Sequence, residues 1–304
     1  MSQLDFNGRV AVVTGAGRGI GLAYARLLAE RGAQVVVNDL GGSIDGVGAD
    51  GTPAAAAVAD IVGSGCVAVA DTNDVASVAG AEALIAAAVD RFGRIDILIN
   101  NAGIIRWAGP PDVDADNLAQ HLAVHVGGSF NTARAAWPHM AGQGYGRIVM
   151  TTSTGMLGLP TNTSYATAKG GVVGLTRSLA TAGAAHGIKV NMIAPGAMTR
   201  MAGPRSDDPR MAPGLVAPMA AYLAHESCPV SGELYTAGFG RFARLFIAST
   251  QGYVHPGSEP TIEDVAAHWD SINDEAGYFV PADLMDWSAA FMAHLHEDGP
   301  SPAP

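Results

Sequence analysis

The chain has 304 residues, of which 48% are hydrophobic and 15% are charged, so a large buried core is expected and disorder is not. Its 17 lysines and arginines against 28 aspartates and glutamates give a formal net charge of −11. Such a field repels nucleic acid and anionic membranes, which are therefore excluded as partners. No uninterrupted apolar run approaches the roughly 20 residues that a membrane helix needs.

The two cysteines, Cys66 and Cys228, lie far apart and fit no metal or redox spacing, so no metal site is predicted. They indicate reduced core residues of a cytoplasmic protein. The N-terminus reaches an apolar strand within about ten residues, which leaves no room for a signal peptide and favours the same location.

Short β-rich runs alternate with Ala-rich helical stretches from residue 9 to about residue 236. Nearly continuous apolar strands imply burial on both faces, hence a parallel sheet covered by helices. We therefore predict an α/β fold, a Rossmann-type doubly wound single domain with a seven-stranded parallel sheet. The predicted strands are 9–14, 34–38, 66–70, 95–100, 147–152, 189–194 and 233–237.

Three segments depart from this alternation of strands and helices. Residues 39–53 form a Gly-rich loop that is longer than a typical strand-to-helix connection. Residues 197–230 carry five prolines and three arginines and are predicted to form a lid. Residues 241–304 are predicted to be a C-terminal helical extension of the same domain, with frayed last residues. Its helical pattern begins at "PTIEDVAAHW", where Thr261 and Asp264 fit a capping box loosely, because Asp replaces the usual Glu or Gln.

The stretch "VVTGAGRGIGLAYARLLAERG" places several glycines between the first predicted strand and the first helix. Glycines let the backbone approach a pyrophosphate, and the helix N-terminus offers N–H donors. Asp39 ends the second predicted strand, where an acid can bind the adenosine ribose hydroxyls and would repel the 2′-phosphate of NADP. No arginine directly follows Asp39, so NAD is the predicted cofactor. Residues 1–240 would then be the dinucleotide-binding and catalytic domain.

The spacing Thr-Gly-x-x-x-Gly-x-Gly, followed by "NNAG", Tyr-x-x-x-Lys and "PG", resembles the short-chain dehydrogenase/reductase family. The resemblance implies a one-domain oxidoreductase that forms homodimers or homotetramers. It also places Asp71 beside the adenine, Asn101 near the cofactor ribose, and the chain after Pro195 against the nicotinamide amide. Together the loop and the resemblance predict these cofactor-binding residues: Gly15, Arg18, Gly19, Ile20, Asp39, Asp71, Asn101, Gly103, Tyr165, Lys169, Pro195, Gly196, Met198 and Thr199.

Hydride transfer between an alcohol and NAD needs a group that takes or gives the hydroxyl proton. Tyr165 and Lys169 would share one face of a helix, because side chains at i and i+4 are neighbours. A free tyrosine, with a pKa near 10, is a poor base at neutral pH, and a nearby lysine ammonium favours the phenolate. The resemblance assigns Lys169 a second task, binding the nicotinamide ribose.

A hydroxyl group upstream should polarise the substrate oxygen, and two ways of counting identify different residues. Counting back 13 residues from Tyr165, the common family spacing, gives Thr152, whereas counting forward seven from Gly146 gives Ser153. Loops absorb deletions better than buried strands do, so the strand count is preferred. The predicted catalytic residues are Ser153, Tyr165 and Lys169, with Thr152 as the alternative to Ser153.

His125 stands where the family usually has an asparagine that takes part in a proton relay toward the active-site lysine. A histidine can carry or order water, but it can equally be a helix-packing residue. Both interpretations stay open for His125.

Longer stretches resemble one branch of the family, the (3R)-hydroxyacyl-CoA dehydrogenase module of a peroxisomal multifunctional β-oxidation enzyme, which also oxidises 17β-hydroxysteroids. The stretches include "NDLGG", "VHVGGSFNTARAAWPHM", "IAPGAMTRM" and "HESCPVSGELYTAGFG". We predict an NAD-dependent oxidoreductase that interconverts a secondary alcohol and a ketone, with a 3-hydroxyacyl-CoA or a hydroxysteroid as substrate. A broad-specificity secondary-alcohol dehydrogenase or ketone reductase is one alternative, and a non-catalytic NAD-binding protein is another.

Charge bears on the choice between these substrates. A CoA thioester is polyanionic, and a chain at −11 would slow its approach unless local cations compensate. A neutral steroid would feel no such penalty. The candidate cations, which could instead be a solvated lid, are Arg106, Arg200, Arg205 and Arg210. The apolar residues expected to flank the site are Met156, Leu157, Leu159, Met198 and Met201.

Overall fold

The computed structural model describes residues 3–201, 208–257 and 259–297. The chain divides into two compact units, Met1–Arg244 and Leu245–Pro304. Arg205, within the predicted lid, and residues 298–304, for which fraying is predicted, lie outside the described residues.

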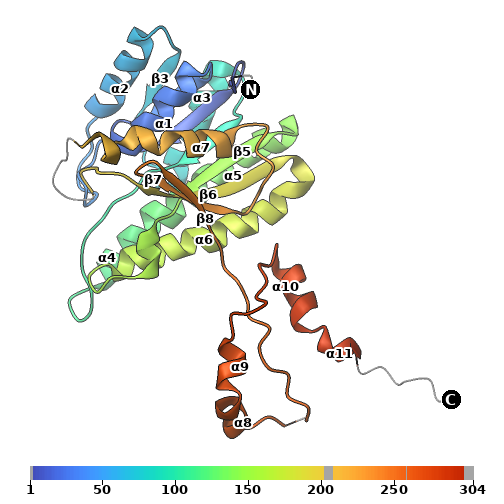
Figure 1. Ribbon diagram of the computed structural model, residues 1–304. Helices are drawn as coiled ribbons and strands as arrows, with labels where there is room; N and C mark the ends of the chain where they lie inside the picture. The colour runs from blue at the N-terminus through green and yellow to red at the C-terminus, as the bar shows by residue number, and fades with distance from the viewer. Residues whose placement is uncertain (1–2, 202–207, 258, 298–304) are drawn as a thin grey trace. The chain divides into compact units, whose positions relative to one another are not determined.

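The first unit contains an eight-stranded sheet in the order β3-β2-β1-β4-β5-β6-β7-β8 (Figure 1). All neighbours from β3 to β7 pair in parallel. The strand order reverses between β1 and β4, and ligands of such sheets bind at the carboxyl ends of the strands beside this point. The strands are β1 Val10–Thr14, β2 Gln34–Asn38, β3 Ala68–Asp71, β4 Ile97–Asn100, β5 Gly146–Thr151, β6 Ile188–Gly196, β7 Leu234–Gly238 and β8 Arg241–Leu245.

The predicted α/β fold is confirmed, and the number of strands is corrected from seven to eight. β8 follows β7 after only Phe239 and Gly240, a connection as short as that of a β-hairpin. Its side chains are exposed or half-buried, because it forms the edge of the sheet. It therefore lacks the continuous apolar run that marks the buried strands.

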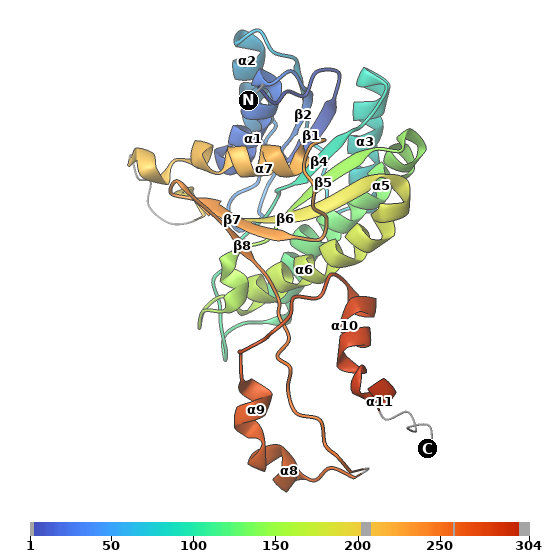
Figure 2. The ribbon, with the colours of Figure 1, turned by 45° about the vertical axis from the view of Figure 1, so that its right-hand side comes forward.

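Helices cover both faces of the sheet, with α1, α2 and α7 on one face and α3, α5 and α6 on the other (Figure 2). Because both faces are covered, every residue of β1, β4 and β5 is buried. The helices of this unit are α1 Gly19–Glu30, α2 Thr52–Gly63, α3 Val78–Phe92, α4 Ala115–His121, α5 Gly128–Gln143, α6 Thr163–Gly183 and α7 Ala217–Ala224.

Helix α3 shows how local sequence fixes these boundaries. Its N-cap residue Ser77 accepts a hydrogen bond from the Gly80 N–H at 3.0 Å, and its C-cap residue Gly93 adopts a left-handed conformation with φ +79°. Between the caps, the buried residues recur at helical spacing and face the sheet: Ala81, Leu84, Ile85 and Ala88.

Helices α4 and α5 are joined without a break by a π-helical segment, Leu122–Gly127. Asp114 caps α4 by accepting a hydrogen bond from the Asn117 N–H at 2.7 Å. π-helical turns inside α-helices are rare and frequently occur at functional sites. This one carries His125, which is only 2% exposed.

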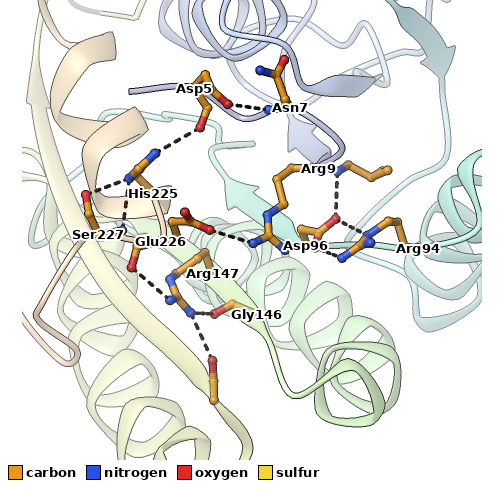
Figure 3. A network of polar contacts seen from close by, with 12 residues as sticks. Asp5, Asn7, Arg9, Arg94, Asp96, Gly146, Arg147, His225, Glu226 and Ser227 are labelled. Atoms are coloured by element: carbon orange, nitrogen blue, oxygen red, sulfur yellow. Dashed lines mark hydrogen bonds and ion pairs between the residues drawn. The ribbon is translucent and has the colours of Figure 1, made fainter. Parts of the chain in front are cut away.

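At the amino ends of β1 and β4, a network of charged side chains ties the strands together (Figure 3). Asp96 is fully buried and accepts hydrogen bonds from the guanidinium groups of Arg9 at 3.0 Å and Arg94 at 2.6 and 2.7 Å. It also accepts one from the Val10 N–H at 2.9 Å. Arg9 reaches on to Glu226 at 2.9 Å. Every contact of the Asp96 carboxylate is thus with a donor.

The same network extends to β5 through an aromatic ring. The guanidinium carbons of Arg9 and Arg147 lie 3.9 and 4.3 Å from the centre of the Tyr145 ring. Arg147 also donates to the backbone carbonyls of Gly146 and Gly187. The amino ends of these strands are thus held together by buried and half-buried charged side chains that have partners.

The second unit contains the short helices α8 Ile262–Ala267, α9 Trp269–Asn273, α10 Leu284–Phe291 and α11 His294–Glu297. The capping box predicted at Thr261 is formed, because Asp264 accepts from the Thr261 N–H and donates its own N–H to the Thr261 hydroxyl. Between residues 245 and 295 no described residue of this unit is buried. Within the described parts of the whole chain, no helix combines the length and the apolar character needed to cross a membrane.

Candidate active site

A tight glycine turn follows β1 at the carboxyl end of the sheet. A Cβ atom on Gly15 would lie 2.8 Å from the Ala102 Cα, and one on Gly21 would lie 2.3 Å from the Gly15 carbonyl oxygen, so neither position has room for a side chain. The Thr14 hydroxyl accepts hydrogen bonds from the N–H groups of Asn101 and Ala102 at 3.0 Å. The Asn101 side chain donates to the carbonyls of Thr14 and Gly15. The predicted loop is therefore fastened to the "NNAG" segment after β4.

A cleft of about 410 Å³ opens above this turn. The predicted cofactor-binding residues that line it are Gly15, Arg18, Gly19, Ile20, Asp39, Asn101, Gly103 and Thr199. The lining residues that sequence reasoning missed include Asn38, Asn73, Asp74, Val75 and Val124, whereas Arg200 and Met201, which also line the cleft, were expected near the substrate. The missed residues come from loops at the carboxyl ends of the strands and from the π-helical segment Leu122–Gly127, whose proximity only the folded chain reveals.

Asp39 lies at the end of β2 with both carboxylate oxygens engaged by backbone donors. One oxygen accepts from the Gly17 N–H at 2.9 Å and the other from the Gly41 N–H at 2.8 Å. Each oxygen keeps further lone pairs for hydroxyl groups. Arg200 reaches across to the Gly42 carbonyl at 3.1 Å. Burial and the nearby Arg18 lower the pKa of Arg200, and the charge of Asp39 opposes that shift.

Asp71 does not line the cleft. Its carboxylate accepts hydrogen bonds from the side chains of Asn38 and Asn73, both at 2.7 Å, and from the Asn73 N–H at 2.9 Å. These two asparagines line the cleft in its place. Asp71, predicted to lie beside the adenine, thus fixes the side chains of the two asparagines that line the cleft.

The "PG" segment ends β6 at a crowded place. Gly196 pairs with Gly238 of β7, and the Phe239 ring lies so close that a Cβ on Gly196 would be 2.8 Å from it. Beyond Pro195 and Gly196, the Met198 N–H donates to the Met211 carbonyl at 2.9 Å. Of the predicted residues here, Thr199 faces the cleft, whereas Pro195, Gly196 and Met198 are not among its lining residues.

The predicted catalytic pair lies on the first turns of α6. The Lys169 ammonium donates to the Thr151 carbonyl at 2.8 Å and lies 5.6 Å from the centre of the Tyr165 ring. Lys169 is only 3% exposed, and this burial lowers its pKa to about 7. Burial also raises the pKa of Tyr165, while a hydrogen bond with the Ser153 side chain acts in the opposite direction.

The two candidate hydroxyls have different surroundings. Ser153 accepts from the Gly155 N–H at 3.0 Å, and its hydroxyl lies beside the Tyr165 ring, since a Cβ on Gly155 would be 3.2 Å from the Ser153 Oγ and 3.0 Å from the Tyr165 Cε1. Thr152 is 1% exposed and donates to the Lys169 carbonyl at 2.8 Å. Ser153 therefore belongs to the constellation around Tyr165, and Thr152 braces the backbone of α6.

His125 also lies against the catalytic pair. Its ring centre is 5.4 Å from that of Tyr165, and a second histidine, His121, has its ring centre 6.2 Å from the same ring. Sequence reasoning singled out His125 but not His121. The four-residue spacing between them was the available signal, because it places both rings on one helix face.

The arginines considered as cations for an acidic substrate have partners. Arg106 pairs with Asp116 at 2.8 Å, and Arg210 pairs with Asp208 at 2.6 Å. Arg200 faces the cofactor cleft. Several apolar side chains near the site are more than half exposed: Trp107, Leu157 and Leu159. In the described parts of the chain, no group of three or more metal-ligating side chains gathers.

Comparison with known proteins gives consistent matches. A family profile described as short chain dehydrogenase matches residues 9–210. The short-chain type dehydrogenase/reductase Rv0148 of Mycobacterium tuberculosis is 42% identical over 273 residues, which cover 88% of this chain and 95% of that protein. Peroxisomal multifunctional enzyme type 2 of Mus musculus is 41% identical over 305 residues, which cover 97% of this chain.

The match to the mouse enzyme spans only 41% of that longer protein. The structure of full-length peroxisomal multifunctional enzyme type 2 from Drosophila melanogaster superposes with a TM-score of 0.81 at 33% identity, over 97% of this chain and 50% of that chain. A short chain dehydrogenase from Mycobacterium avium gives a TM-score of 0.78 at 34% identity, over 89% of this chain and 97% of that chain. The chain belongs to the short-chain dehydrogenase/reductase family and is an oxidoreductase.

Proposed function

We propose that this oxidoreductase uses NAD to interconvert a secondary alcohol and a ketone. The observation that carries the proposal is the grouping of Ser153, Tyr165 and Lys169. The Ser153 hydroxyl and the half-buried Tyr165 ring both border Gly155, and the buried Lys169 ammonium lies one helical turn from Tyr165. Such a grouping can move a proton at a substrate hydroxyl.

The residues present in the cleft fit a dinucleotide. Gly15 and Gly21 leave no side chain between the turn and a bound pyrophosphate, and the N-terminus of α1 presents N–H donors there. Asp39 offers carboxylate lone pairs to ribose hydroxyls and repels a 2′-phosphate, which favours NAD over NADP. When bound, NAD supplies the hydride acceptor and a positive charge on its nicotinamide ring.

Within the site each side chain has one task. The Ser153 hydroxyl donates to the substrate oxygen and holds it beside the phenol. The Tyr165 oxygen accepts the hydroxyl proton during oxidation and returns it during reduction. Burial alone raises the pKa of Tyr165, so the phenolate must be stabilised by positive charge. Lys169, held by the Thr151 carbonyl, supplies that charge when protonated.

For the substrate we propose a 3-hydroxyacyl-CoA or a hydroxysteroid. The similarity to peroxisomal multifunctional enzymes along 97% of the chain supports the thioester. The ion pairs of Arg106 and Arg210 favour the neutral steroid, because they leave less positive charge for CoA phosphates. Exposed Trp107, Leu157 and Leu159 suit the apolar part of either molecule.

The test is the rate of NADH formation at 340 nm with a (3R)-hydroxyacyl-CoA and a 17β-hydroxysteroid side by side. We expect turnover with at least one of them. The kcat/KM with NAD should exceed that with NADP by at least about 10-fold, because placing the 2′-phosphate of NADP against the Asp39 carboxylate costs more than about 1.4 kcal/mol, the equivalent of 10-fold. NADH binding without turnover on either substrate or on simple secondary alcohols would contradict the proposal and indicate a non-catalytic NAD-binding protein.

We propose two further properties. The family resemblance supports a homodimer or homotetramer, which sedimentation velocity would measure directly. Cys66 and Cys228 are both free thiols, in keeping with a reducing compartment such as the cytoplasm.

A further inference from the structure

Two stacked imidazole rings lie against the Tyr165 ring. The rings of His121 and His125 lie 5.9 Å apart at an interplanar angle of 15°, one helical turn from each other. Both meet the Tyr165 ring at close to a right angle, 84° for His121 and 89° for His125. Neither histidine is more than 2% exposed, so the rings are fixed by packing.

The hydrogen-bond partners assign opposite tautomers to the two rings. The His121 Nδ1 lies 2.7 Å from the Asn117 carbonyl and must donate to it, which leaves Nε2 to accept the Arg106 N–H at 3.3 Å. The His125 Nε2 lies 2.8 Å from the Ile104 carbonyl and 3.3 Å from the Ile104 N–H. Because the carbonyl oxygen is nearer and can only accept, Nε2 of His125 carries the proton.

These bonds make the pair a link between three elements. Through Ile104 and Arg106 the rings hold the backbone that follows the "NNAG" segment, and through their edges they touch Tyr165 on α6. Gly103 and Ile104 also line the cofactor cleft. A Cβ on Gly103 would lie 2.6 Å from the His125 Cε1, so the ring is pressed against the cleft wall.

One ring nitrogen of the two histidines takes no part in these hydrogen bonds. The Nδ1 of His125 is buried and has no hydrogen-bond partner, and in the assigned tautomer it bears a lone pair. Burial, and after it the positive charge of Lys169, lowers the pKa of this ring. An acceptor buried without a donor costs free energy, so its retention beside the catalytic residues indicates a task there.

We propose that His121 and His125 are positioning residues of the dehydrogenase site. They fix the Tyr165 ring and the 104–106 backbone relative to one another, so that the phenol oxygen faces the substrate hydroxyl above the cofactor cleft. The inference rests on the proposed function, because it assigns the pair to that reaction. It accounts for both tautomers, both ring contacts and the burial of two histidines at one site.

The kinetic test uses His125→Phe, which keeps a ring beside Tyr165 but removes the hydrogen bond to Ile104, and His125→Gln, which can restore that bond. We expect kcat to fall on the order of 10–100-fold in His125→Phe, the cost of a slightly misplaced reacting group, with the NADH Kd within about 2-fold. His125→Gln should recover part of the loss. His139→Gln, an exposed histidine on α5, is the matched control and should behave as wild type.

Two kinetic outcomes would overturn the proposal. One is a wild-type kcat in His125→Phe, and the other is a parallel loss of kcat and NADH affinity in both variants, which would indicate a general structural role.

A second measurement does not depend on turnover. Nitrogen NMR of histidine-labelled protein should show His125 as the Nε2–H tautomer and His121 as the Nδ1–H tautomer between pH 6.5 and 9, each assigned by its Phe variant. An imidazolium or the reverse tautomer at either position would overturn the inference. If the tautomers are as assigned but wild type turns over no substrate, the proposed function fails while the hydrogen-bond assignment stands.

Discussion

At the amino ends of the strands the sheet buries Asp96 among four donated hydrogen bonds, whereas at the carboxyl ends it buries Lys169 against a backbone carbonyl. Asp96 faces two guanidinium groups, and Lys169 forms no ion pair within the described residues. Burial without a counter-charge shifts the pKa of Lys169 to about 7, into the range useful for catalysis. We call the amino ends of the strands the amino edge and their carboxyl ends the carboxyl edge, as distinct from the outermost strands. The two hold buried charged groups for different purposes.

The difference shows that residues that stabilise the fold and residues proposed to carry the reaction lie at opposite ends of the strands. A buried carboxylate with complete hydrogen bonding stabilises the strands that it joins, so its loss should affect unfolding. A buried ammonium without a counter-charge is destabilising in the folded chain and is retained where a reaction uses it. Variants at the two edges should therefore change different measurements.

Tyr165→Phe should have the largest effect, confined to the carboxyl edge. It removes the proton acceptor and leaves the ring packed against the histidines, so kcat/KM should fall by about 10²–10⁴-fold. Steady-state NADH formation measures this loss, and fluorescence titration should show an NADH Kd within about 2-fold of wild type. A residual rate above a tenth of wild type would assign the proton transfer to another group.

Asp96→Ala should have the largest effect at the amino edge. It leaves the partly exposed guanidinium groups of Arg9 and Arg94 without their shared carboxylate and the Val10 N–H without an acceptor, and losing such charge-assisted hydrogen bonds costs about 2 kcal/mol of unfolding free energy. Urea denaturation measures the change, and kcat/KM at 25 °C should stay within about 2-fold of wild type. Equal stability of the variant would remove the distinction drawn between the edges.

Ser153→Ala and Thr152→Val form a matched pair within the site. Ser153→Ala removes the hydroxyl that lies beside Tyr165, so kcat/KM should fall on the order of 10–100-fold, the range for a single hydrogen-bonding group to a polarised oxygen. Thr152→Val removes the bonds to the Lys169 carbonyl and the Met156 sulfur and should cost about 1 kcal/mol of stability. If the Thr152 variant lost more activity than the Ser153 variant, the assignment of the two hydroxyls would be reversed.

A further prediction concerns Lys169 and the pH dependence of stability. Its pKa is about 7 in the folded chain against an ordinary value of 10.5, so between these values the unfolded chain binds a proton that the folded chain does not. The unfolding free energy should therefore rise with pH from about 7 toward 10.5, and this gain is lost as the pH falls from 10.5 to about 7. Below about 7 both states bind the proton, so Lys169 causes no further change. Urea denaturation at pH 7 and 9.5 should show wild type gaining stability relative to Lys169→Met. A constant difference between the two proteins would mean that Lys169 stays charged when folded.

The sequence was sufficient where its pattern reflects burial. Seven strands follow from apolar runs because parallel strands bury both faces, and the glycine turn follows from its place between a strand and a helix. The edge strand β8 was not predicted because Arg241–Leu245 contains two arginines and an exposed phenylalanine and has no buried residue. Its position depends on the hairpin at Phe239, where φ is +54°, which no apolar pattern records.

Other features depend on contacts between distant residues. The spacing could not decide between Thr152 and Ser153, because the direction of each hydroxyl depends on how α6 packs beside β5. The sequence does not show the partners of the candidate cations, yet Arg106 pairs with Asp116 in the first turn of α4. Likewise, the stacking of His121 on His125 depends on the π-helical segment that joins α4 to α5.

The most direct test of the account is a single-turnover reaction of the purified chain with NAD and the preferred alcohol, carrying either hydrogen or deuterium on the carbinol carbon. We predict an absorbance rise at 340 nm that is slower with deuterium and abolished in Tyr165→Phe, while the Asp96→Ala protein reacts as wild type does below its unfolding transition. No absorbance change from wild-type protein saturated with NAD would contradict the account, because the carboxyl edge would then bind the dinucleotide without using it.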